Sequence, residues 1–177
     1  MQPTNATQSR PVQSQNIERP QPGTLQKLMV LWFIGAAFML TLGRSFLGSG
    51  GWMTILYIFT VAPFLSFYGL FVSAIVYVRW KKTGYVFSRW MKAALGIFLV
   101  ATGVHSVTLV DGGDTNESIN SVLTNVMGVN GQNGMDSPLM NLSNSLANVS
   151  KVVIVVTLVA MLLLAFLDGR RVSKKSH

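Results

Sequence analysis

The sequence predicts an all-α, polytopic membrane protein with four transmembrane helices, and three observations lead to this fold class. Half of the 177 residues are hydrophobic and only 11% are charged, whereas a soluble domain has about 25% charged residues. Four apolar runs approach or exceed the length that crosses about 30 Å of hydrocarbon. The basic residues stand beside these runs and not along one solvated face, which is the membrane pattern.

The chain begins with a polar segment, residues 1–24, that is rich in Gln, Asn, Pro and Ser. Such a composition buries too little apolar surface to offset the entropy lost on ordering. We therefore expect a disordered cytoplasmic tail, followed by a four-helix membrane domain over residues 25–177. No small-residue cleavage site follows the first apolar run, so that run is expected to remain as an uncleaved anchor.

The first two spans are predicted at residues 28–47 and 52–78, joined by a glycine-rich turn that suits antiparallel neighbours. Arg44 lies near the far end of the first span, and its long side chain is expected to extend to the interface. The second span is long for a bilayer. Pro63 gives it a position to kink, because proline removes a backbone donor and crowds the preceding turn.

The connection between the second and third spans, residues 79–92, sets the predicted orientation. It interleaves Trp and Tyr, which favour the lipid headgroup layer, with five basic residues. Positive clusters beside spans stay on the cytoplasmic side. We therefore predict a tight cytoplasmic turn whose headgroup-contacting, topology-setting residues are Arg79, Lys81, Lys82, Arg89 and Lys92.

The third span is predicted at residues 93–110, and an extracytoplasmic loop follows at residues 111–150. Asp114 and Glu117 have the spacing of a capping box, and Gly128 is a natural helix stop. The apolar residues between them follow the rhythm of a one-sided helix. The loop is thus expected to contain a short amphipathic helix with the apolar face Ile119, Val122, Leu123, Val126 and Met127.

Ser137 and Pro138 read as an N-cap followed by proline at the first helical position. One helix is therefore expected to run from Pro138 to Leu167, with residues 152–167 as the fourth span. If both termini and the 79–92 connection lie inside, only Arg44 and Lys151 of the 14 basic residues lie outside. This bias predicts an N-in/C-in orientation, and the layout of the chain suggests a bacterial inner, or cytoplasmic, membrane as its location.

Small and weakly polar residues recur within the spans, where they allow helices to approach closely. The predicted helix-packing positions are Gly35, Ala62, Ser66, Gly69, Ser73, Gly96 and Gly103. Tyr77 and His105 form a possible intramembrane polar site, because an ionisable residue within a span is a functional candidate. Two alternatives stay open: a water-lined path along the hydroxyls of the second span, and a simple hydrogen bond from His105 to a neighbouring helix.

Several classes of chemistry lack the residues they need. The chain has no cysteine and only two histidines, so thiolate catalysis is excluded and no zinc or iron site with three or four ligands is expected. No second aspartate lies within a span to form an aspartyl dyad. The sequence thus predicts no enzyme activity, no cofactor and no metal, and it identifies no small-molecule substrate. The charge of +8 belongs to the flanks of the spans, so no nucleic acid is expected.

These observations favour a non-catalytic integral membrane subunit of a larger assembly, for which a bacterial secretion or conjugation complex is one host. The expected partners are the lipid bilayer and other membrane proteins or copies of the chain itself. The alternative is a self-associating channel, a transporter component or a holin-like pore, lined by Ser66, Ser73, Tyr77 and His105. A membrane-anchored adaptor is a third possibility.

Overall fold

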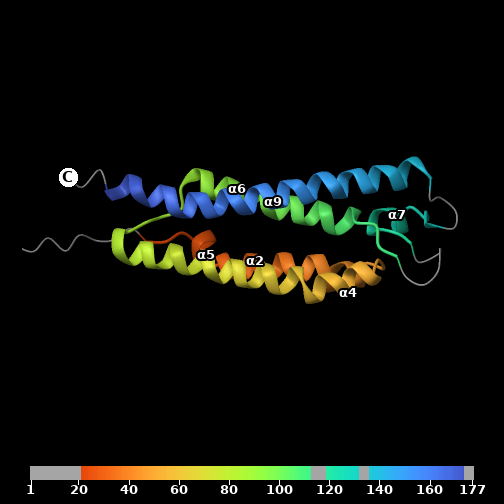
Figure 1. Ribbon diagram of the computed structural model, residues 1–177, viewed down its shortest axis with the longest axis horizontal. Coiled ribbons are helices and arrows are strands. Elements are labelled where there is room, and N and C mark those ends of the chain that lie inside the picture. The colour runs from red at the N-terminus through yellow and green to blue at the C-terminus, as the bar shows by residue number, and fades with distance from the viewer. Residues whose placement is uncertain (1–20, 113–118, 132–135, 174–177) are drawn as a thin grey trace, which may run out of the picture.

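The computed structural model describes residues 21–112, 119–131 and 136–173, and side chains as far as residue 167. These residues form helices, turns and one isolated antiparallel bridge between Asp111 and Asn120, with no strand among them. The helices lie side by side in an elongated bundle of two layers, with α2, α4 and α5 in one layer and α6 and α9 in the other (Figure 1). Residues 1–20 of the predicted tail, Asp114 and Glu117 lie outside the described residues.

Four helices are long and apolar enough to cross a membrane: Met29–Phe46, Trp52–Thr83, Arg89–Thr108 and Pro138–Leu167. Their bounds lie close to the predicted spans, apart from an extension of the second toward Thr83 and of the fourth toward Pro138. The all-helical, four-span prediction is thus confirmed in its coarse form, and it suggests an integral membrane protein.

The first span consists of several helical pieces. It contains α2 (Met29–Phe38), a π-helix η1 (Met39–Gly43) and α3 (Arg44–Phe46), and it is preceded by the short α1 (Thr24–Lys27). The π-helix widens the backbone where α6 crosses it, and the Ser106 hydroxyl donates to the Met39 carbonyl over 2.6 Å. The Arg44 side chain therefore leaves the helix just after a locally altered turn.

The second span breaks near Pro63. α4 (Trp52–Phe59) and α5 (Val61–Thr83) meet at Thr60, whose φ and ψ of −117° and −61° depart from the helical values. Proline has no N–H to donate to the carbonyl four residues earlier, so the turn before Pro63 opens. The expected kink is present, three residues ahead of the proline.

The connection between α5 and α6 is shorter than the predicted 79–92 segment. α5 ends at Thr83, and the next residue, Gly84, adopts a φ of +68° in the left-handed region that favours glycine. α6 (Arg89–Thr108) begins after Ser88, whose hydroxyl accepts from the Met91 N–H at 3.2 Å. Only residues 84–88 lie outside a helix, so the basic residues of the connection stand on the helix ends.

The loop after α6 contains α7 (Val122–Val126), which is shorter than the predicted amphipathic helix. Its N-cap is Ser121, which forms a capping box with Thr124. Val122 is buried and Leu123 half-buried, but Val126 and Met127 are 76% and 63% exposed. Ile119 precedes the helix, so the five predicted apolar residues do not share one packed face.

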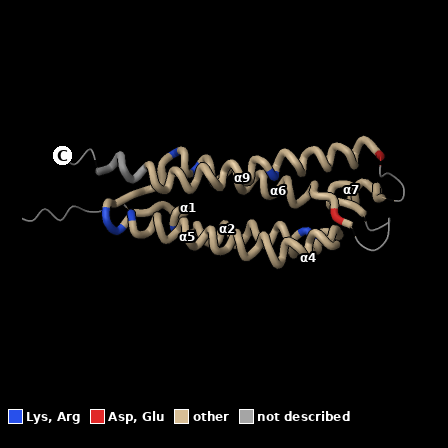
Figure 2. The backbone as a smooth tube through the Cα atoms, in the orientation of Figure 1, with Lys and Arg blue, Asp and Glu red and all other residues tan. Residues whose placement is uncertain are grey.

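The last helix, α9, runs without interruption over Pro138–Ser173. Its start matches the expectation, because the Ser137 hydroxyl accepts from the Met140 N–H at 3.2 Å. We call the end of the bundle that holds residues 84–88 the turn end, and the opposite end, which holds α7, the loop end. α1 and the C-terminal part of α9 lie at the turn end (Figure 1), and basic residues gather there (Figure 2).

Aromatic side chains close the centre of the bundle. Phe33 and Phe98 are fully buried, with ring centroids 5.1 Å apart, and the Tyr68 ring lies 5.4 Å from that of Phe33. The Tyr68 hydroxyl donates to the Leu158 carbonyl of α9, which joins the two layers. A methyl group added at Gly69 would lie 2.6 Å from Phe33 Cβ, so α2 and α5 are in close contact.

Candidate functional site

A buried carboxylate organises the loop end. Asp111 is 2% exposed, and its oxygens accept from the N–H groups of Gly51, Met53 and Thr54 at 2.8–2.9 Å and from the Thr54 hydroxyl at 2.9 Å. These N–H groups begin α4 and have no partner within that helix. Asp111, which follows α6, therefore caps a helix distant in sequence and favours its N-terminal dipole.

Arg44 lies beside this carboxylate and is also fully buried. Its Nη1 stands 3.7 Å from Asp111 Oδ2, while Nη2 donates to the Leu109 carbonyl at 2.7 Å and to the Ser49 hydroxyl at 3.3 Å. The expected extension of Arg44 to the interface is therefore wrong. The guanidinium turns inward because a buried carboxylate and a free carbonyl offer it compensation that lipid does not.

The environment of Asp111 favours its ionised form. Burial by itself raises the pKa of this carboxyl, but hydrogen bonds from Met53 and Thr54, together with the charge of Arg44, outweigh burial and hold the pKa below its usual value. The carboxylate is thus charged at neutral pH and available to cap α4.

A second group of buried hydroxyls attaches α7 to the bundle. The Ser121 and Ser143 hydroxyls lie 2.8 Å apart, and Ser143 donates to the Thr108 carbonyl at the end of α6. The bridge between Asp111 and Asn120 adds two backbone hydrogen bonds of 2.8 and 3.0 Å. These contacts hold α6, α7 and α9 together where α6 ends.

His105 connects three helices below this network. Its Nδ1 lies 2.9 Å from the Ala147 carbonyl and 3.2 Å from the Ser150 hydroxyl of α9, and its Nε2 lies 3.1 Å from the Tyr57 hydroxyl of α4. A carbonyl only accepts, so the proton of the neutral ring belongs on Nδ1, and Nε2 accepts from Tyr57. The ring is 4% exposed and has partners on both flanking helices.

The predicted polar residues do not line a common path within one chain. Ser66 donates to the Ala62 carbonyl of its own helix at 2.8 Å. Ser73 and Tyr77 lie toward the turn end of α5, whereas His105 lies toward the loop end. Phe33 and Phe98 fill the bundle between these two regions.

The predicted packing glycines differ in what they contact. Gly69 meets Phe33 closely, whereas a methyl group added at Gly35, Gly96 or Gly103 would have no atom within 4 Å. Gly96 instead belongs to an apolar groove of about 560 Å³ between α6 and α9. Ala62 lies half-buried beside the core. The groove, which we call the α6–α9 groove, is lined by Ala93, Gly96, Ile97, Val100, Ala101, Val104, Leu146, Val149, Ser150 and Val153.

The predicted headgroup-contacting residues gather at the turn end. Arg79 donates to the Phe166 carbonyl at 2.8 Å and lies over the Phe166 ring. The Lys81 ammonium lies 5.1 Å from the Tyr77 ring centre, and the Arg89 guanidinium lies 5.2 Å from that of Trp90. Lys82 and Lys92 are exposed. This end thus combines cations with aromatic rings.

Within the part of the chain that the structure describes, no three His, Asp or Glu side chains come together to hold a metal. The buried polar groups of the loop end instead contact one another and backbone groups, with Arg44 Nε and Nη1 left without a hydrogen bond, so their arrangement fixes loops and helix ends. Sequence reasoning missed the Arg44–Asp111 pair. The available signal was Arg44, a cation inside one predicted span, and Asp111, an anion at the end of another. The two can pair only if their helices end side by side, which the sequence does not show.

Comparison with known proteins gives no family: no protein-family model, no curated protein and no solved structure matches the chain. What the chain does must therefore be inferred from its own geometry.

Proposed function

We propose that the chain is a non-catalytic integral membrane subunit that packs against another membrane protein through the α6–α9 groove. The observation that carries this proposal is the shape and chemistry of that groove. Its lining is apolar except for Ser150 and includes the small residues Ala93, Gly96 and Ala101. Small residues between two helices admit a third helix at close range, where dispersion contacts favour association in lipid.

The groove lies within two of the candidate spans, Arg89–Thr108 and Pro138–Leu167. An occupant at that depth must be lipid or protein whose backbone is already hydrogen-bonded, and a transmembrane helix meets this requirement. The exposed Val100 and Val149, at 69% and 62% of their surface, extend the apolar face on either side. A partner helix with small residues of its own would bury both.

We further propose that both termini and the turn end face the cytoplasm, in a bacterial inner membrane. The support is the gathering of cations at the turn end (Figure 2), whereas Arg44 is buried beside Asp111 and Lys151 lies within the fourth candidate span. A cluster of Lys and Arg beside short connections is retained on the cytoplasmic side.

The test fills the groove without disturbing the chain. Gly96→Leu places a side chain where no atom lies within 4 Å of an added Cβ, and Gly35→Leu does the same on α2, away from the groove. Cross-linking in native membranes, followed by mass spectrometry of the neighbours, should lose a partner with Gly96→Leu and keep it with Gly35→Leu. Neighbours from a secretion or conjugation apparatus would assign the host assembly.

If Gly96→Leu keeps every cross-linked partner of the parent, the proposed groove contact is contradicted. The pore alternative makes a different prediction, because it requires ion or solute flux from the purified protein in liposomes. The buried contact between Phe33 and Phe98 in the core of the single chain supports the subunit over a pore within one bundle.

A further inference from the structure

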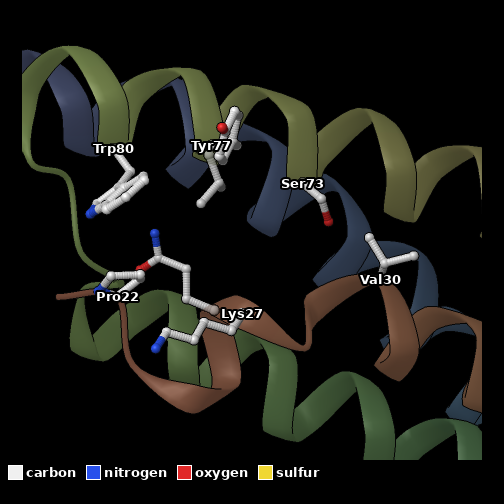
Figure 3. A pocket seen from close by; sticks show the side chains of 8 residues that line it. Pro22, Lys27, Val30, Ser73, Tyr77 and Trp80 are labelled. Carbon is white, nitrogen blue, oxygen red and sulfur yellow. The ribbon is translucent and has the colours of Figure 1, made fainter.

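A second cavity, of about 310 Å³, opens at the turn end between residues 22–30 and α5. Figure 3 shows Pro22, Lys27 and Val30 on one side of it and Ser73, Tyr77 and Trp80 on the other. Gln26 completes this side and also holds the neighbouring turn: its Nε2 donates to the Tyr85 carbonyl at 3.2 Å, and its Oε1 accepts from the Phe87 N–H at 3.1 Å. The walls are therefore fixed by contacts of their own.

Ser73 has an unsatisfied hydroxyl at the inner part of this cavity. The two other Ser and Thr residues of α5, Ser66 and Thr83, donate to the carbonyls four residues earlier at 2.8 and 2.9 Å. The Ser73 oxygen is buried and has no hydrogen-bond partner, and it points toward the cavity (Figure 3). A buried hydroxyl without a partner costs free energy, which an acceptor inside the cavity would recover.

Cationic and interfacial side chains border the same cavity. Lys27 lines it, and Lys81 stands over the ring of Tyr77, which also lines it. Trp80 lies two helical turns from Ser73, about 10 Å along the axis at 1.5 Å per residue. The order along α5 is thus a hydroxyl within the candidate span, then a tyrosine, then a tryptophan and lysines near its end, and these last side chains are the types that favour the headgroup layer.

We propose that this cavity binds one anionic phospholipid. The lipid phosphate lies against the Lys27 ammonium. An ester carbonyl, on the hydrocarbon side of the phosphate, accepts a hydrogen bond from the Ser73 hydroxyl. An acyl chain lies along Val30 and Val76. The headgroup of this lipid carries no ammonium of its own, which suits a cavity that has Lys27 in its lining and Lys81 over the ring of Tyr77. This lipid site is independent of the proposed partner groove, which lies between other helices.

Trp80 provides a direct readout. The full chain has four tryptophans, and Trp32, Trp52 and Trp90 are at least 36% exposed, so replacing those three by Phe leaves Trp80 as the sole emitter. This protein is placed in phosphatidylcholine vesicles that contain increasing brominated phosphatidylglycerol, whose bromine quenches nearby indole. Quenching is expected at a low mole fraction of the brominated lipid.

Lys27→Gln should raise the mole fraction at half-quenching about tenfold, which corresponds to ~1.4 kcal/mol, and Ser73→Ala should raise it less. Ser73→Leu fills the cavity and should abolish quenching at low mole fraction. Ser66→Ala and Lys92→Gln are the matched controls, because neither residue lines the cavity, and both should leave the midpoint unchanged.

The proposal is overturned if Lys27→Gln and Ser73→Leu quench like the parent. It is also overturned if brominated phosphatidylcholine quenches the parent at the same low mole fraction, since the lysine would then play no part. Reversal of quenching by soluble glycerol phosphate would mean a site for a free anion and would equally reject the lipid. The measurements with brominated phosphatidylcholine and with glycerol phosphate use no variant of a cavity residue, so they remain valid even if such a variant fails to fold.

Discussion

Asp111 receives hydrogen bonds from the first turn of α4 and lies next to the buried Arg44. Removing this carboxylate leaves the α4 donors and the guanidinium without an anion in a buried environment. We expect Asp111→Ala to lower the free energy of unfolding by about 3–5 kcal/mol, as for loss of one partner of a buried ion pair. Reversible unfolding in SDS measures this, with the exposed Asp136→Ala as the control; equal stability of the two variants would contradict the role of Asp111.

The charge of Asp111 also predicts how stability depends on pH. The pKa of Asp111 in the folded protein is lower than its usual value, which for an unperturbed Asp is about 3.9. The unfolded state therefore binds more protons between the two values, and the contribution of Asp111 is complete above about pH 4 and falls as the pH drops through the folded pKa. The thermal unfolding temperatures of the parent and of Asp111→Asn should differ at neutral pH and converge once the pH falls below the folded pKa. A constant difference at all pH values would contradict this.

At the scale of helices, the contact between α2 and α5 depends on the absence of a side chain at Gly69. An added Cβ would lie 2.6 Å from Phe33 Cβ, inside a core that Phe98 and Tyr68 already fill. We expect Gly69→Ala to cost about 1–3 kcal/mol through overpacking. Gly35→Ala is the matched control, since its Cβ meets open space and the helix gains from losing a glycine; unfolding in SDS should separate the two.

For the whole molecule, the proposed orientation can be tested because the chain contains no cysteine. Lys82→Cys marks the turn end and Val126→Cys marks the loop end, and both positions are exposed. A membrane-impermeant maleimide should label Val126→Cys in intact cells and Lys82→Cys only after permeabilisation. The opposite pattern would reverse the orientation, because the positive cluster would then lie outside.

The sequence by itself determined the features that depend on local composition. Apolar runs predict four spans because each backbone must satisfy its own hydrogen bonds in lipid, and Pro63 and Pro138 mark a break and a start through the geometry of their own backbones. These effects act over a few residues, so they can be read without knowing what lies nearby.

Only the tertiary structure decided which distant groups meet. The pairing of Arg44 with Asp111, the burial of His105 between Tyr57 and Ala147, and the cavity that joins Lys27 to Ser73 each unite residues that are more than forty positions apart. Their partners depend on the rotation and relative height of whole helices, which side-chain packing sets through the close contact at Gly69 and the aromatic core. The sequence shows that the charge of Arg44, within an apolar span, needs a partner. The packed bundle determines that this partner is the buried carboxylate of Asp111.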